Sequence, residues 1–252
     1  MPEYFIFRLF FANISLQILN QQTRKIMTKK IFLLIFITIL TVTFSLSAKE
    51  KSISPKKFKS TDIGNPEISG ESEIDEKSVT ITAGGADIWG KQDEFRFVYL
   101  EQSGDFDFAA RIESLTDPHL YTKAGLMARE NLSDNCRHIY FQVFPNNNPR
   151  NKNNGGYEFQ FRQENDGEMK AIYPAKSDGV PEFPVNYPNT WIRLNRSGNV
   201  FTGYYSADGK NWKVYTTHSL DLPSKIYIGL AVTSHNTKKK VTAVFRDLTL
   251  EH

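Results

Sequence analysis

Cysteine is almost absent from this sequence, because Cys136 is the only one among the 252 residues. No intramolecular disulfide can form, so the fold has to be stabilised by the packing of its core. Zinc sites are not indicated either, since the five histidines show no ligand spacing. A thiol nucleophile is also disfavoured, because the sequence places no third, orienting group beside Cys136 and His138.

An excess of charge of one sign is missing as well. Without residues 1–48, the chain keeps 26 of its 31 Lys and Arg residues and 27 of its 28 Asp and Glu residues, so it is nearly neutral. The only dense basic run that is left, Lys238-Lys239-Lys240, is typical of a solvated hairpin tip. A nucleic-acid binder would show a basic stripe, so we predict no nucleic-acid partner.

Residues 27–48 have the pattern of a signal peptide. Two lysines precede a continuous apolar run from Ile31 to Phe44, and small residues follow it. We predict cleavage after Ser47 or Ala48. The alternative is an uncleaved signal anchor, but the apolar run is shorter than the roughly 20 residues that span a bilayer. The protein is therefore expected to be secreted, periplasmic or at the cell surface, with no stable membrane insertion after cleavage.

Three further segments complete the expected organisation. Residues 1–26 are an N-terminal extension if the true start codon is Met27 rather than Met1. Residues 49–60 are rich in Lys and Ser and predict a flexible linker. Residues 61–252 suit one β domain, because sandwiches of about 200–250 residues commonly fold as a single unit.

No long helical pattern is present in the domain. Instead, short segments alternate apolar and polar residues between Gly, Asn, Asp and Pro. The predicted strands are 79–82, 95–100, 106–113, 124–129, 138–144, 157–162, 169–173, 191–195, 200–206, 213–219, 226–232 and 241–250. Such strands, rich in aromatic and β-branched residues, predict an all-β fold of two packed antiparallel sheets, a β-sandwich. Two long loops, 145–156 and 174–188, are either recognition loops or insertions without a role.

Five motifs carry a family resemblance, and they occur in this order: Gly84–Gly90, Phe95–Tyr99, Lys123–Arg129, Ser206–Trp212 and Gly229–His235. They resemble the bacterial domain-of-unknown-function family 1349 from about Thr61 to the C-terminus. The resemblance implies a concanavalin A-like lectin/glucanase jelly roll, related in fold to laminin-G domains. Family members often belong to exported carbohydrate-active proteins, which favours glycan binding by analogy, although a fold does not by itself define a function.

Catalytic residues are not evident in the sequence. Hydrolases of this superfamily carry a Glu-x-Asp-x-Glu strand, whereas Glu71, Glu73 and Asp75 share a strand face in a different order and without flanking aromatic residues. There is also no Gly-x-Ser-x-Gly nucleophile elbow. We therefore predict that the domain is not an enzyme.

Strand alternation separates a core face from an outward face. If strands 123–129, 138–144, 157–162 and 191–195 are neighbours, their outward residues form one polar face that suits sugars, with rings to stack and polar groups to hydrogen-bond. The alternative is an ordinary solvated surface with internal ion pairs. The predicted ligand-binding residues are Lys123, Arg129, Tyr140, Gln142, Gln160, Arg162, Trp191, Arg193 and His235.

Other conspicuous residues have structural interpretations. Ser206–Trp212 resembles a shortened Asp-box, a hairpin turn in which Asp caps the loop and Gly takes a positive φ. Trp89 is interpreted as a core plug, with a lid over a groove edge as the alternative. No cofactor is predicted, although oxygen-rich loops around Asp87, Asp93 and Asn146–Asn154 leave calcium possible.

The predicted function is that of an exported, non-catalytic module that binds a glycan on a sheet face. An extracellular protein-interaction or structural domain without a sugar site is the alternative, and a glycoside hydrolase is a third, less favoured one.

Overall fold

The computed structural model describes residues 21–25, 27–30, 52–148, 150, 155–173 and 182–252. The chain divides into two units, Met1–Lys49 and Glu50–His252. In the first unit, residues 21–25 and 27–30 are helical. Among the described residues, no helix has both the length and the apolar character needed to cross a membrane. Most of the predicted signal peptide lies outside the described residues, so its cleavage stays a prediction.

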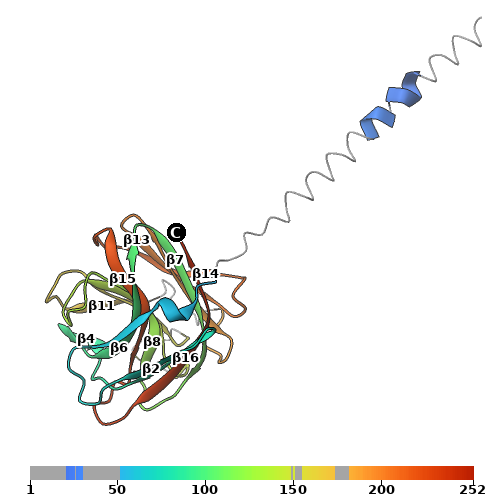
Figure 1. The fold of residues 1–252 in the computed structure, drawn as a ribbon. Coiled ribbons are helices and arrows are strands. Elements are labelled where there is room, and N and C mark those ends of the chain that lie inside the picture. Colours follow the sequence, from blue (N-terminus) through green and yellow to red (C-terminus); the bar gives the residue numbers. More distant parts are fainter. Residues whose placement is uncertain (1–20, 26, 31–51, 149, 151–154, 174–181) are drawn as a thin grey trace, which may run out of the picture. The chain divides into compact units, whose positions relative to one another are not determined.

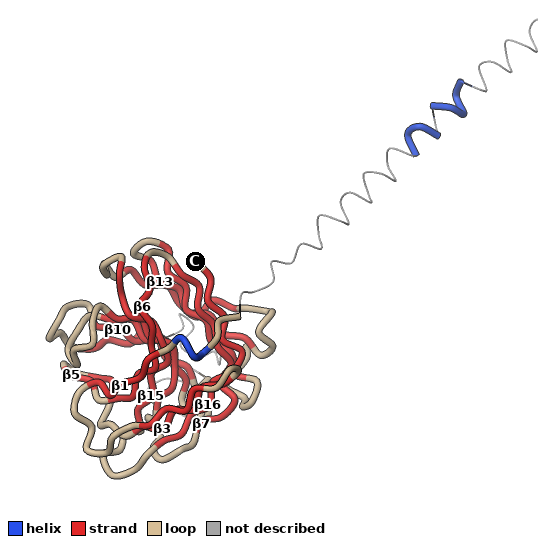
Figure 2. The backbone as a smooth tube through the Cα atoms, in the orientation of Figure 1, coloured by secondary structure: helices blue, strands red, loops and turns tan. Residues whose placement is uncertain are grey.

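Two seven-stranded antiparallel sheets make up the described part of the second unit (Figures 1 and 2). The first sheet has the order β1 (Lys59–Ile63), β6 (Phe95–Ser103), β15 (Lys225–Thr233), β8 (Lys123–Arg129), β9 (His138–Val143), β10 (Tyr157–Arg162) and β11 (Met169–Ile172). The second has the order β14 (Lys213–Ser219), β13 (Val200–Ser206), β12 (Thr190–Ser197), β7 (Phe106–Leu115), β16 (Val241–Glu251), β3 (Ser78–Ala83) and β2 (Glu71–Ile74). A short hairpin, β4 (Ile88–Trp89) and β5 (Gln92–Asp93), stands apart from both sheets.

The core lies between the two sheets, and alternation along the strands builds it. On β3, Val79, Ile81 and Ala83 are fully buried, whereas Thr80 and Thr82 between them are partly exposed. This pattern is typical of an antiparallel sheet with one face in the core and the other in water. The all-β, antiparallel two-sheet sandwich predicted from the sequence is therefore confirmed.

The first sheet differs, because every residue of β8, β9 and β10 is buried. A second apolar cluster covers the face of this sheet that points away from the main core. Its members are Ile63, Ile88, Phe95, Phe97, Met127, Tyr140, Met169 and Ala231. The β4–β5 hairpin contributes Ile88 to this cluster, so it lies over the sheet and shields polar side chains that alternation alone would leave in water.

The segment predicted as a linker is part of the domain. Ser52 forms a β-bridge with Thr249, and the amide of Ile53 donates to the carbonyl of Leu248 at 3.1 Å. A 3-10 turn over Pro55–Lys57 follows, and Phe58 is buried in the main core. The prediction of a flexible linker is therefore wrong for residues 52–60, because backbone pairing with β16 and the burial of Phe58 hold this Lys-rich stretch against the sandwich.

Two motif glycines allow neighbouring strands of the first sheet to approach closely. A Cβ added to Gly229 on β15 would lie 2.1 Å from the carbonyl oxygen of Val98. A Cβ on Gly125 of β8 would lie 2.3 Å from the carbonyl oxygen of Phe141. Neither neighbour is a flexible side chain, so the backbone itself would have to move.

We therefore expect Gly229→Ala to lower the free energy of unfolding by about 1–3 kcal/mol, the usual cost of overpacking. Urea unfolding followed by tryptophan fluorescence measures this. Gly198→Asn is the matched control, because no atom lies within 4 Å of a Cβ at Gly198 and Asn tolerates its φ of 60°. Equal losses in the two variants would contradict the close approach at Gly229.

Candidate functional site

Three motifs that are far apart in the sequence meet where two central strands of the first sheet, β8 and β15, begin and end. The Thr122 hydroxyl donates to the carbonyl of Ser234 at 2.8 Å, and the Ser234 hydroxyl donates to the carbonyl of Gly85 at 3.1 Å. The amide of Asn236 also donates to Gly85, at 3.2 Å. These bonds tie the chain before β4, the start of β8 and the end of β15 together, and each segment contributes one functional side chain.

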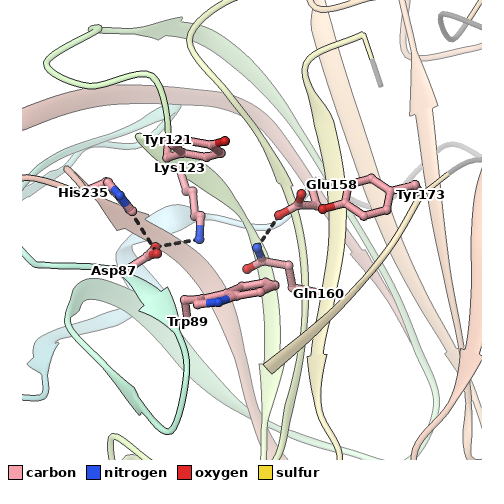
Figure 3. Close-up of a pocket in the computed structure, with 8 residues that line it drawn as sticks. All are labelled: Asp87, Trp89, Tyr121, Lys123, Glu158, Gln160, Tyr173 and His235. Atoms are coloured by element: carbon pink, nitrogen blue, oxygen red, sulfur yellow. Dashed lines mark hydrogen bonds and ion pairs between the residues drawn. The ribbon is translucent and has the colours of Figure 1, made fainter. Parts of the chain in front are cut away.

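The three side chains are Lys123, Asp87 and His235 (Figure 3). The Lys123 ammonium donates to Asp87 Oδ1 at 2.6 Å and to the carbonyl of Ile88 at 3.1 Å. His235 Nδ1 lies 3.0 Å from Asp87 Oδ2. Burial alone would raise the pKa of Asp87, but Lys123 and His235 outweigh it and lower that pKa. The carboxylate is thus ionised, with the Lys123 ammonium hydrogen-bonded to one oxygen and the His235 ring beside the other.

Glu158 and Gln160, both on β10, lie opposite this cluster (Figure 3). Gln160 Nε2 donates to Glu158 Oε1, and Gln142 Nε2 on the adjacent strand donates to the same oxygen at 3.3 Å. Burial raises the pKa of the Glu158 carboxyl, although Lys123 and hydrogen bonds from Tyr173 and Gln160 oppose the rise. This side of the pocket is therefore a hydrogen-bonded group of one carboxyl and two amide side chains.

Between the two groups lies a cavity of about 230 Å³ with aromatic walls formed by Trp89, Tyr121 and Tyr173. Trp89 is 42% exposed, and the Lys123 ammonium lies 5.5 Å from the centre of its ring. Beside Asp87, the ring of His235 stacks on the ring of His119, with the ring centres 4.4 Å apart. The interpretation of Trp89 as a core plug is therefore wrong: it forms a wall of the pocket, as the lid alternative requires.

The pocket includes three of the predicted ligand-binding residues, Lys123, Gln160 and His235. Tyr140 and Gln142, on β9 of the same sheet, do not line the pocket: the Tyr140 hydroxyl donates to the carbonyl of Ala231 at 2.9 Å, and Gln142 bonds to Glu158. Sequence reasoning did not select Trp89, Tyr121, Glu158 and Tyr173, and it considered Asp87 only as a calcium ligand. Asp87 and Trp89 stand in the first family motif, and that position was the signal that could have identified them.

Arg129 and Arg162 are fully buried, so the expectation that they line an exposed binding face is wrong. The Arg162 guanidinium forms two 2.7 Å bonds with the carboxylate of Asp93. Arg129 lies 4.0 Å from the same carboxylate, and its guanidinium donates to the carbonyls of Asn131 and Ser133. Both side chains do point away from the main core, but the β4–β5 hairpin and the loop after β8 cover them.

Trp191 and Arg193 were predicted to share one face with the residues of β8, β9 and β10. This prediction is wrong, because both residues lie on β12, which belongs to the second sheet. Arg193 pairs with Asp107. The ring of Trp191 packs on Gly209, which has a φ of 69° in the turn after β13. In that turn Asp208 Oδ1 accepts the amides of Lys210 and Asn211 at 2.8 Å each, which agrees with the structural interpretation of the Asp-box motif.

The described residues do not fit a calcium site. Hard cations need several carboxylate and carbonyl oxygens that are free to turn toward them. Arg162 holds the carboxylate of Asp93, and Lys123 and His235 hold that of Asp87. Within the described part of the chain, no group of three or more His, Cys, Asp or Glu side chains could hold a metal ion. Of the loop proposed for calcium, Asn151 to Asn154 lie outside the described residues.

The fold and the pocket define the class of protein: a concanavalin A-like jelly roll with a compact pocket of aromatic and polar side chains against its first sheet. The chain belongs to the family described as "Protein of unknown function (DUF1349)", whose model matches residues 66–252. The family resemblance seen in the five sequence motifs is thus confirmed. Among curated proteins, none matches the sequence significantly.

Solved structures of the same fold come from distant proteins. A functionally unknown protein from Saccharomyces cerevisiae superposes with a TM-score of 0.59 at 13% identity, over 79% of this chain and 98% of that one. The GH43 protein BlXynB from Bacillus licheniformis gives 0.50 at 9% identity, over 71% and 37%. Carbohydrate binding module CBM66 from Bacillus subtilis gives 0.49 at 16% identity, over 81% and 98%. At such identities these likenesses concern the fold alone.

The buried pair of Arg162 and Asp93 leads to a stability prediction. Asp93→Asn keeps the size of the side chain but leaves two buried guanidinium groups without a carboxylate, so we expect a loss of about 3–5 kcal/mol in unfolding free energy. Asp107→Asn is the control, because its pair with Arg193 is partly exposed and should be worth about 1 kcal/mol or less. Thermal and urea unfolding measure both, and similar small losses would contradict the role given to Asp93.

His138 leads to a prediction of pH dependence. Burial lowers the pKa of this histidine from 6.5 to about 4, with Asp93 opposing the shift. Between these two values the unfolded chain binds a proton that the folded chain does not, so stability falls as the pH falls from 6.5 to 4. The loss is at most about 1.4 kcal/mol per pH unit for one proton.

Urea unfolding at several pH values in this window measures that slope. In the protein, His138 Nδ1 lies 3.0 Å from the carbonyl oxygen of Cys136. His138→Gln keeps a polar side chain at this position but removes the titrating ring, so its unfolding free energy should change less with pH. An unchanged slope in the variant would show that other groups cause the acid sensitivity.

Proposed function

We propose that this domain is a non-catalytic carbohydrate-binding module whose ligand occupies the pocket between Trp89, Lys123 and Gln160. The observation that carries the proposal is the combination of an exposed indole at the pocket wall with buried polar groups on its floor. Sugars present both an apolar ring face and several hydroxyls. Aromatic rings with a few fixed polar groups are the usual means of binding such ligands.

The acidic side chains support binding rather than hydrolysis. A glycosidase needs one carboxyl group that donates a proton and a second, unobstructed carboxylate that attacks or activates water. Asp87 is ionised, but Lys123 and His235 engage both of its oxygens. Glu71 and Glu73 of the earlier acidic segment lie on β2, an edge strand of the second sheet, where Glu71 pairs with Lys240, and Asp75 follows that strand. That segment does not line the pocket.

The solved structures of similar fold are compatible with this proposal but do not indicate a particular ligand. One structure of the same fold forms part of a GH43 protein, but at 9% identity the likeness does not extend to a ligand or an activity. The proposal therefore rests on the pocket residues. If no sugar binds in the test below, the alternative function, a protein-interaction domain, is favoured.

We further propose that the protein is exported and that residues 27–48 are its signal peptide. Expression of the full chain in a bacterial host, followed by cell fractionation and N-terminal sequencing, tests this. The expected mature N-terminus is Ala48 or Lys49. A chain with the intact N-terminus in the cytoplasmic fraction would contradict the proposal, and deletion of the residues between Ile31 and Phe44 is the matched control for loss of export.

Binding to a glycan array, followed by calorimetry on the best ligand, tests the main proposal. Trp89→Ala should weaken binding about tenfold or more, since removing a stacking ring costs at least about 1.4 kcal/mol when the ring is buried by ligand. Trp191→Ala is the matched control, because this ring lies on the other sheet and should leave affinity unchanged. Loss of binding in Trp191→Ala alone would move the site to the second sheet, and hydrolysis of a bound glycan would overturn the non-catalytic role.

A further inference from the structure

We infer that the pocket binds a single terminal sugar unit that carries no charge and donates a hydroxyl hydrogen to Gln160 Oε1. This inference rests on the proposed function and adds the size, charge and hydrogen-bonding pattern of the ligand. It excludes an internal segment of a polysaccharide, an acidic sugar and an amino sugar.

The size of the cavity favours one sugar ring. Its volume of about 230 Å³ is below the roughly 300–1,000 Å³ of pockets that enclose drug-sized ligands. Trp89 stands on the β4–β5 hairpin at one wall, and Tyr121 precedes β8 at another (Figure 3). An extended chain would need an open groove across several strands, whereas these walls enclose space at one point of the sheet.

The charges around the cavity favour a neutral ligand. Lys123 is already neutralised by Asp87, to which it donates at 2.6 Å, so it offers no uncompensated charge to an anion. The same ammonium lies 5.5 Å from the centre of the Trp89 ring, so a cationic ligand near that ring would be repelled by a charge of the same sign. A ligand carboxylate would meet Asp87, and a ligand ammonium would meet Lys123.

The hydrogen-bonding groups show what the ligand must supply. Gln160 is fully buried, and its Oε1 accepts no hydrogen bond from any described residue. Its amide nitrogen faces Glu158, and a carboxylate can only accept, so the carbonyl side of the amide is left without a donor. A buried acceptor without a donor is unfavourable, and a ligand hydroxyl would satisfy it.

Lys123 provides the complementary donor. An ammonium has three N–H bonds, and Asp87 and the carbonyl of Ile88 accept two of them. The third has no acceptor among the described residues, and the side chain lines the cavity. A hydroxyl has both a hydrogen and lone pairs, so neighbouring hydroxyls on one sugar ring can donate to Gln160 and accept from Lys123.

Calorimetry with matched sugars tests the inference. The panel contains neutral monosaccharides, the corresponding uronic acids and amino sugars, and neutral oligosaccharides of increasing length that end in the same unit. We expect one neutral monosaccharide to bind about as tightly as its oligosaccharides, and the charged analogues to bind about tenfold more weakly or worse.

The outcomes separate this inference from the proposed function. If affinity rises steadily with chain length and monosaccharides do not bind, the terminal-unit inference fails while carbohydrate binding stands. If a uronic acid or an amino sugar is preferred, the inferred charge is wrong. If no carbohydrate binds, the proposed function itself fails.

Monodeoxy sugars test the role of Gln160. Removing the hydroxyl that donates to Oε1 should weaken binding to the wild-type protein about tenfold, and it should cost little further in Gln160→Ala. Gln163→Ala, at a side chain that contacts His218 on β14, is the control and should behave as wild type. If every monodeoxy sugar loses the same affinity in Gln160→Ala as in wild type, Gln160 does not accept from the ligand. The deoxy series on the wild-type protein still identifies required hydroxyls if the variant fails to fold.

Discussion

The ion pair between Arg162 and Asp93 is the contact on which the candidate site depends. A hairpin with two residues in each strand, such as β4–β5, has little stability of its own. Arg162 reaches from β10 to the Asp93 carboxylate on β5 and to the carbonyl of Gly90 in the turn, at 3.1 Å, and so holds the hairpin on the sheet. Because the pair has no exposed surface, its two hydrogen bonds have to compensate for the hydration that both charged groups lose.

The position of this hairpin changes the character of the sheet below it. Polar side chains on β8, β9 and β10 would form an ordinary wet surface if the hairpin were absent. Under it, Lys123, Gln142, Glu158 and Gln160 are all buried, and each has to find a partner inside the protein. Most of their groups do, through Asp87 and through Glu158 itself. Of the groups that do not, Gln160 Oε1 belongs to a residue that lines the pocket and can bind a polar ligand there.

Strand positions could be predicted from the sequence, because alternation is a local property. The predicted strand 157–162 coincides with β10, and 138–144 exceeds β9 by one residue. The direction of each side chain was also predicted correctly for Arg129 and Arg162, which do point away from the main core. Their burial was not, because alternation says which face a residue is on and not whether another segment covers that face. Trp191 failed for a related reason: the order of strands in a sheet depends on contacts between distant residues.

The sequence by itself determined the all-β sandwich, since the period of two along each strand decides which residues can be buried, and its five motifs determined the family. Only the tertiary structure decided where the site lies. Asp87, Lys123 and His235 come from three separate motifs. They meet because hydrogen bonds join Thr122 to Ser234 and Ser234 to Gly85, which holds the three chain segments together. No local pattern encodes such a meeting, because the three segments become neighbours only when strands far apart in the sequence pair in the first sheet.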